Sequence, residues 1–187
     1  MHTIYTGERT RIRPFRDADE WHYTVSLDCG VPNEHWGPWH CPRAHALKEF
    51  EETGLVAPDK YSAMAIERVD TGELVGLEEH GAMHPGKTST WIGTFVMKEH
   101  RKQGFGAEAK QLMLCYLFEN FPLSTVIADT TATHRDAKRG LELCGMHFIG
   151  ARRKAHCYHG KYVDVVLYQI MRADWEAGEY RSKVQRG

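Results

Sequence analysis

Several features that would place this 187-residue chain in a familiar class are missing from it. No apolar run approaches the roughly 18 residues that a membrane-spanning helix needs. The first residues lack the apolar segment of a secretory signal. The formal net charge is only −1, which argues against nucleic acid or an anionic membrane surface as a partner. We therefore expect a cytoplasmic chain of ordinary globular composition.

Signals for disulfide or metal frameworks are missing as well. The five cysteines are widely spread and include no C-x-x-C pair, so neither a disulfide framework nor a zinc ribbon is expected. Histidine, in contrast, occurs twelve times, but its spacing matches no zinc motif. We therefore predict no metal site and interpret most of the histidines as polar loop residues.

The most informative segment that is present spans residues 91–108. A strand-like run ends at Met97, a basic glycine-rich turn follows, and a helix opens immediately after it. Glycines let backbone N–H groups converge, and the free amides and dipole of a helix start favour a phosphate. Arg101 and Lys102 add positive charge at the same place. This order predicts a pyrophosphate site.

Two common phosphate-binding motifs do not fit this turn. A dinucleotide fold needs a third glycine and an acidic residue about 20 positions later, whereas Gly104 and Gly106 are followed by Ala107. A nucleotide P-loop needs Gly-Lys-Ser/Thr, which the turn lacks. The pattern Arg-x-x-Gly-x-Gly, placed after a strand, instead resembles the acyl-CoA turn of the GNAT acetyltransferase superfamily.

Periodicity and turn signals predict the remaining elements. Asp70-Thr71-Gly72 between two strand-like runs is a strong hairpin signal, and the helix after the glycine turn must end before Pro122. The predicted strands cover about 10–15, 61–69, 73–83, 89–97, 125–128, 147–158 and 161–171, and the other predicted helices about 17–27, 43–53 and 135–143. This order predicts a single α/β domain over 1–187, with a mostly antiparallel sheet of about seven strands, helices on both faces and a frayed tail from 176.

Three runs of the chain resemble one branch of the GNAT superfamily. Residues 7–19 are similar to its opening strand and helix cap, 91–109 to its central motif, and 160–175 to its closing strands. Together they resemble the ribosomal-protein N-terminal acetyltransferase branch over nearly the whole chain. The resemblance implies the GNAT fold, acetyl-CoA as cofactor, and direct transfer of the acetyl group to an amine.

The same resemblance implies which residues hold the cofactor. Backbone groups of Phe95, Val96 and Met97 are expected beside the pantetheine amides. The pyrophosphate is expected to lie in the turn formed by Arg101, Lys102, Gln103, Gly104, Phe105, Gly106 and Ala107.

Three positions at which family members commonly carry catalytic side chains differ in this chain. The usual Asn-x-x-Ser at the start of a later helix is replaced by His134 and Ala137. The usual helix tyrosine falls on Leu141, and the strand carboxylate of some members falls on Thr90 and Trp91. Either other residues perform the chemistry, or the chain is a non-catalytic acyl-CoA-binding module.

His156 is the leading candidate for the general base. The resemblance places it where ribosomal-protein members carry a base carboxylate, and histidine titrates near the pH at which an alkylammonium must lose its proton. Glu78 and Glu79 are alternative bases or substrate-binding carboxylates, of which at most one can face a cleft, because neighbouring strand residues point to opposite sides. His134 is a further catalytic candidate, placed to contact the cofactor or its thiolate.

Trp36 and Trp39 are the predicted acceptor-binding residues, since they lie in the loop that shapes the acceptor site in this fold. Tryptophan suits an amine-bearing acceptor through stacking and cation–π contact; a lid or half of a dimer interface is the alternative. The predicted function is acetyl-CoA-dependent N-acetylation of a small-molecule or amino-acid-like amine. Nα-acetylation of a protein N-terminus is the alternative, and the sequence leaves monomer and homodimer open.

Overall fold

In the computed structural model, the residues described are 4–30, 41–57, 59–83, 86–158 and 160–187. They form one nine-stranded sheet in the order β7-β8-β6-β5-β4-β3-β2-β1-β9. The strands are β1 (Tyr5–Thr6), β2 (Thr10–Arg13), β3 (Ser62–Arg68), β4 (Leu74–His80), β5 (Ser89–Val96), β6 (Thr125–Thr131), β7 (His147–Tyr158), β8 (Lys161–Met171) and β9 (Gln185–Arg186). The helices are α1 (Ala18–Gly30), α2 (Arg43–Thr53), α3 (Phe105–Asn120), α4 (Arg135–Leu143) and α5 (Arg172–Ala177), with 3-10 turns η1 (Lys98–His100) and η2 (Glu179–Lys183).

This architecture confirms the predicted fold class. Of the strand pairings between described residues, only β5 with β6 is parallel, and the others are antiparallel. The sheet exceeds the predicted seven strands because β1 and β9, of two residues each, are too short to show a periodicity. In place of the frayed tail predicted from residue 176, the chain forms η2 and β9.

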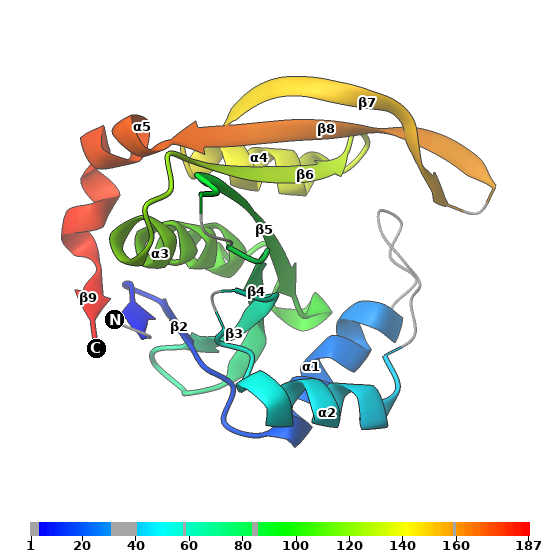
Figure 1. The fold of residues 1–187 in the computed structure, drawn as a ribbon, viewed down its shortest axis with the longest axis vertical. Helices are drawn as coiled ribbons and strands as arrows, with labels where there is room; N and C mark the ends of the chain where they lie inside the picture. Colours follow the sequence, from blue (N-terminus) through cyan, green and yellow to red (C-terminus); the bar gives the residue numbers. More distant parts are fainter. Residues whose placement is uncertain (1–3, 31–40, 58, 84–85, 159) are drawn as a thin grey trace.

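The two ends of the chain lie side by side (Figure 1). β9 pairs antiparallel with β1, with Arg186 opposite Tyr5. The Arg186 guanidinium also forms an ion pair of 2.6 Å with Glu119 of α3. These long-range contacts anchor the last residues, so their polar composition does not leave them without structure.

Each face of the sheet carries its own hydrophobic core, because successive strand residues point to opposite sides. In β3, Ala63 and Ala65 face the core that includes α1 and α2, whereas Met64 and Ile66 face the core that includes α3. Figure 1 shows α1 and α2 packed together, apart from α3. None of the helices in the described part of the chain is long and apolar enough to cross a bilayer.

A buried ionic network fixes the start of α1 against the sheet. The Arg13 guanidinium, on β2, lies 2.7 Å from Glu67 of β3 and 2.7 Å from Glu20 of α1. Hydrogen bonds from Arg13 and the backbone N–H of Arg16 hold the pKa of Glu20 below its usual value, against the opposing effect of burial. The network therefore sets the position of α1, which carries Asp28, a group that acts on the site described below.

Candidate active site

The parallel strands β5 and β6 pair only at their beginnings. Their register runs from Ser89 opposite Thr125 to Trp91 opposite Ile127. Beyond that point β5 continues beside β4 and β6 continues beside β8, so the two strands separate toward their carboxyl ends. Backbone groups that no strand pairs are free for a ligand, and ligands of open α/β sheets bind beyond carboxyl strand ends. This opening is the candidate cofactor site.

The glycine turn lies at the carboxyl end of β5. Lys102 and Gly104 both have left-handed backbone, with φ of 61° and 88°, and together they turn the chain into α3. Among the described residues, no side chain caps the start of α3, which leaves its first amides available to an anion. A Cβ on Gly106 would lie 3.0 Å from the side chain of Val96, so glycine lets the helix start approach the strand closely.

The cations of the turn form no close ion pair within the described chain. Arg101 donates from Nε to the carbonyl oxygen of Val96 at 2.8 Å, and its guanidinium lies 5.8 Å from the ring centre of Phe95. Neither Arg101 nor Lys102 forms an ion pair with a described carboxylate. Two unpaired cations, an uncapped helix start and separating strands fit the diphosphate and pantetheine of a CoA molecule.

The backbone N–H of Met97, predicted to contact the cofactor, already forms a hydrogen bond within the protein. The N–H of Met97 donates to the carbonyl oxygen of Val75 at 2.9 Å, so it is already satisfied. Together with the Arg101 bond to the Val96 carbonyl, this leaves fewer free backbone groups at the end of β5 and the residue after it than the sequence predicts.

Glu79 of β4 lies beside the opening. It is paired with Gly93, two residues beyond the last β5–β6 pair, and its carboxylate covers this glycine. A Cβ at position 93 would overlap Oε1 of Glu79, so the close approach depends on glycine. The hydroxyl of Tyr61 donates to Oε2 at 2.6 Å, which fixes the carboxylate in this position.

Glu79 belongs to a group of carboxyls whose pKa values are all raised. Burial raises the pKa of Glu79, and the charges of Asp28 and Glu49 raise it further, while the Tyr61 hydrogen bond lowers it. Burial also raises the pKa of Asp28 to about 6, opposed by Arg101, and raises that of Glu49. A bound cation would relieve the repulsion that Asp28 and Glu49 exert on Glu79.

Aromatic rings flank the same carboxylate. The ring centres of Tyr61 and Trp91 are 6.3 Å apart, and Trp91 is 41% exposed. A hollow of about 330 Å³ opens beside α2 and is lined by His45, Lys48, Glu49, Glu52, Thr53, Lys60 and Tyr61. Tyr61 therefore both lines this hollow and donates a hydrogen bond to the Glu79 carboxylate.

Glu78, predicted to bind the substrate, lies on the opposite face and requires a correction. Its side chain is 0% exposed and faces α3, opposite Met64 and Thr94 on the neighbouring strands. Among the described residues, neither of its oxygens has a hydrogen bond of ordinary geometry, although the Thr94 hydroxyl is near enough to lower the pKa slightly. Glu78 is therefore a core residue with no access to an acceptor.

Three other strands lie between the strand of His156 and the strand of Glu79 in the sheet order. His156 lies on the edge strand β7, opposite Val163, in an arm of the β7–β8 hairpin that extends beyond β6 (Figure 1). A bulge precedes it, where the Asp164 carboxylate accepts the N–H of Lys154 at 2.8 Å. β4, which carries Glu79, is four places away in the strand order. The two predicted bases therefore lie on strands that do not pair with each other.

His134 lies at the carboxyl end of β6, where it is the N-cap of α4. Its Nδ1 is 3.4 Å from the hydroxyl oxygen of Thr130, the penultimate β6 residue. The glycine turn follows β5, the other strand of the opening. The contact of His134 with the cofactor stays a prediction.

The positions at which relatives carry other catalytic groups supply none here. Leu141 is 3% exposed and belongs to the core beneath α3, and the Thr90 hydroxyl donates to the carbonyl oxygen of Gly81 at 2.9 Å. Ala137 has no group that could transfer a proton. Trp36 and Trp39 lie outside the described residues.

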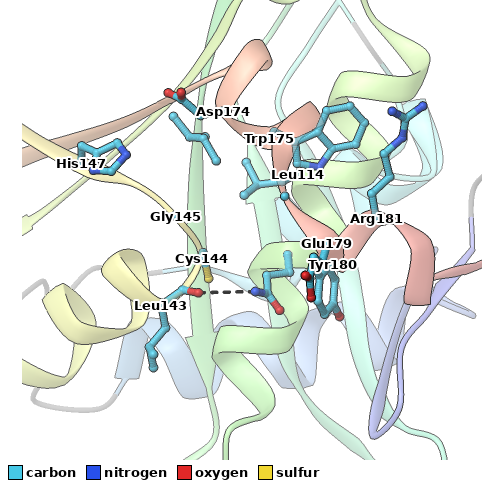
Figure 2. A pocket seen from close by; sticks show the side chains of 13 residues that line it. Leu114, Leu143, Cys144, Gly145, His147, Asp174, Trp175, Glu179, Tyr180 and Arg181 are labelled. Carbon is cyan, nitrogen blue, oxygen red and sulfur yellow. Dashed lines mark hydrogen bonds between the residues drawn. The ribbon is translucent and has the colours of Figure 1, made fainter.

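A second hollow is lined by a different set of residues (Figure 2). It has a volume of about 350 Å³ and lies between α3, the α4–β7 turn and the C-terminal segment. Its lining includes Leu114, Cys144, Asp174, Trp175 and Glu179, but none of the residues of the glycine turn or around Glu79. The described residues contain no group of three or more His, Cys, Asp or Glu that could hold a metal ion.

Comparison with known proteins identifies the family. The model for the acetyltransferase (GNAT) domain matches residues 9–147, which include the opening, the glycine turn and Glu79. The chain belongs to this family of acetyltransferases. GNAT acetyltransferases use acetyl-CoA, in agreement with the predicted cofactor. No curated protein matches the chain.

Several solved structures share the fold. RimL, described as a ribosomal L7/L12 α-N-protein acetyltransferase in complex with coenzyme A, has a TM-score of 0.77 at 14% identity, covering 90% of this chain and 97% of its own. Spermidine N-acetyltransferase from Vibrio cholerae, in complex with CoA and spermine, has a TM-score of 0.78 at 17% identity, covering 89% and 98%. A probable GNAT acetyltransferase from Chromobacterium violaceum has a TM-score of 0.72 at 18% identity, covering 94% and 89%.

The close approach of Glu79 to Gly93 can be tested with one methyl group. In Gly93→Ala the new Cβ must displace the Glu79 carboxylate, and we expect kcat/KM for the acceptor to fall by about 10-fold or more, with unchanged CoA affinity by calorimetry. Gly150→Ala is the matched strand control, because no described atom lies within 4 Å of a Cβ there. Equal activity of both variants and wild type would show that the position of Glu79 has no role in the reaction.

Proposed function

We propose that the protein transfers the acetyl group of acetyl-CoA to a primary amine of a small, positively charged acceptor. The observation that carries this proposal is the Glu79 carboxylate, held over Gly93 by Tyr61 beside the separating strands. Its raised pKa brings it closer to neutral pH than an ordinary glutamate, which suits a general base. The site thus combines a cofactor opening with a base on the face that carries α1 and α2.

The proposed division of roles follows from this placement. Bound acetyl-CoA supplies the activated thioester. Asp28, Glu49 and the faces of Tyr61 and Trp91 attract the alkylammonium, and Glu79 accepts its proton. The amine nitrogen then forms the new C–N bond as the C–S bond breaks; the nitrogen releases its second proton to water, and the leaving sulfur takes one. His134, at the end of β6, is the proposed donor of that proton.

Nα-acetylation of a protein N-terminus is the second candidate. It is supported by the likeness to RimL, whereas the likeness to spermidine N-acetyltransferase supports a small cationic amine. A peptide N-terminus also presents one protonated amine. The small cationic acceptor is favoured because the charges of Asp28 and Glu49 both act on the Glu79 carboxyl, so acidic groups from three segments surround one point.

An acceptor panel distinguishes these candidates. We expect kcat/KM to be highest for a polyamine such as spermidine, about 10-fold lower for a monoamine of similar length, and lowest for peptides beginning with Ser, Ala or Met. Activity confined to peptides would support the second candidate instead. CoA binding without turnover of any acceptor would indicate a non-catalytic acyl-CoA-binding module.

A further inference from the structure

Arg9 is a cation at the glycine turn that comes from a different segment of the chain. The turn between β1 and β2 is fixed by the Glu108 carboxylate of α3, which accepts the N–H groups of Glu8, Arg9 and Thr10 at 2.8, 3.1 and 2.8 Å. The Thr10 hydroxyl donates to the same carboxylate at 2.6 Å. This attachment holds the Arg9 backbone beside the first turn of α3, while its side chain stays exposed.

The Arg9 guanidinium lies against the turn itself. Its Cζ is 5.2 Å from the ring centre of Phe105, the first residue of α3. A Cβ on Gly104 would lie 3.1 Å from Nη1 of Arg9, so the guanidinium borders the left-handed glycine. The aromatic contact orients the guanidinium without neutralising it.

A second arginine, Arg68, contacts the same ring as Arg9 but differs from it in its ion pairs. Its Cζ also lies near Phe105, 5.5 Å from the ring centre, but its guanidinium is paired with Asp70 at 2.7 Å and Glu73 at 3.8 Å. Arg9 forms no ion pair with any carboxylate in the described ranges. Two arginines thus contact one ring, and only one is free to bind a ligand anion.

Acetyl-CoA offers two chemically separate phosphate groups, the diphosphate and the 3′-phosphate monoester of the ribose. The turn amides, Arg101 and Lys102 suit the first. We propose that Arg9 binds the 3′-phosphate and thereby selects CoA over nucleotides that lack it. A planar guanidinium donates two parallel hydrogen bonds to a phosphate, and its fixed position reduces the entropy lost on binding. The proposal rests on the cofactor of the proposed function and is independent of the acceptor.

Calorimetric titration without acceptor tests the proposal directly. The ligands are CoA and 3′-dephospho-CoA, and the proteins are wild type, Arg9→Gln and the matched control Arg68→Gln. We expect the wild type and Arg68→Gln to prefer CoA by about 10-fold or more, since a charge-assisted phosphate contact has this order of effect. Arg9→Gln should lose that preference by binding CoA more weakly and 3′-dephospho-CoA as before. Thermal unfolding of Arg9→Gln should match that of wild type, because the side chain is exposed.

Two results would overturn the assignment: an unchanged CoA affinity in Arg9→Gln, or an equal loss of affinity for both ligands, which would place Arg9 on the diphosphate. Absence of CoA binding by the wild type would overturn it together with the cofactor site. Binding of CoA without acetylation of any amine would instead contradict only the proposed function.

Discussion

Replacing Glu79 by Gln is expected to lower kcat by about 100-fold or more, because an amide cannot accept the proton of the attacking amine. The amide oxygen can still accept the Tyr61 hydroxyl, so the geometry at Gly93 should be kept. In the wild type, the rate should rise with pH as Glu79 loses its proton, with a midpoint above that of an ordinary glutamate, since burial raises its pKa. Steady-state rates over a pH series measure both effects.

Glu78→Gln provides the matched control for this experiment. The two glutamates are neighbours in β4, but Glu78 faces α3 and has no exposed surface. We expect its replacement to leave kcat/KM and the pH profile of the rate near wild-type values. A Glu79→Gln variant as active as Glu78→Gln, with the same rising limb, would remove Glu79 from the chemistry and return attention to His156.

Glu78→Gln should have its own large effect, on stability. Burial raises the pKa of Glu78 to about 8, and the opposing influences of Lys110 and Thr94 are smaller. The unfolded chain loses this proton near pH 4.5, whereas the folded protein keeps it up to about pH 8. Because the folded state binds more protons between these values, the wild-type free energy of unfolding must fall as pH rises through this range.

Gln carries no titrating proton, so the variant avoids this loss. We expect similar stability of wild type and Glu78→Gln at pH 5, and an advantage of roughly 3 kcal/mol for the variant at pH 8. Urea unfolding at both values measures the difference. A variant less stable than wild type at pH 8 would show that the Glu78 carboxyl contributes favourable contacts to the core.

Local signals explain why so much of the fold could be predicted. Short sequence signals predict where the neighbouring strands and helices begin and end. These signals are the hairpin turn at Asp70-Thr71-Gly72, the helix breaker Pro122 and the glycine turn. α2 and α4 begin and end at the predicted residues. β1 and β9 escaped prediction because they are stabilised by each other and by α3, contacts between opposite ends of the chain.

The acceptor side depends on long-range contacts that no local pattern reveals. Tyr61 and Glu79 meet because β3 and β4 are adjacent, and Asp28 influences them from the end of α1. One signal was available in the sequence: Gly93 stands inside a strand, where glycine often marks a close approach of another group. Because neighbouring strand residues point to opposite faces, the sequence predicts that Glu78 and Glu79 lie on different faces of the sheet. Only the packing of α3 shows that Glu78 is the buried one.

The most direct test of acetyl transfer at this site is mass spectrometry of spermidine incubated with the purified protein and isotope-labelled acetyl-CoA, alongside the Glu79→Gln and Glu78→Gln variants. An acetyltransferase with Glu79 as base should yield labelled N-acetylspermidine with wild type and Glu78→Gln, and very little with Glu79→Gln. Failure of the wild type to acetylate spermidine or any other amine of the panel, despite binding CoA, would contradict the proposed activity.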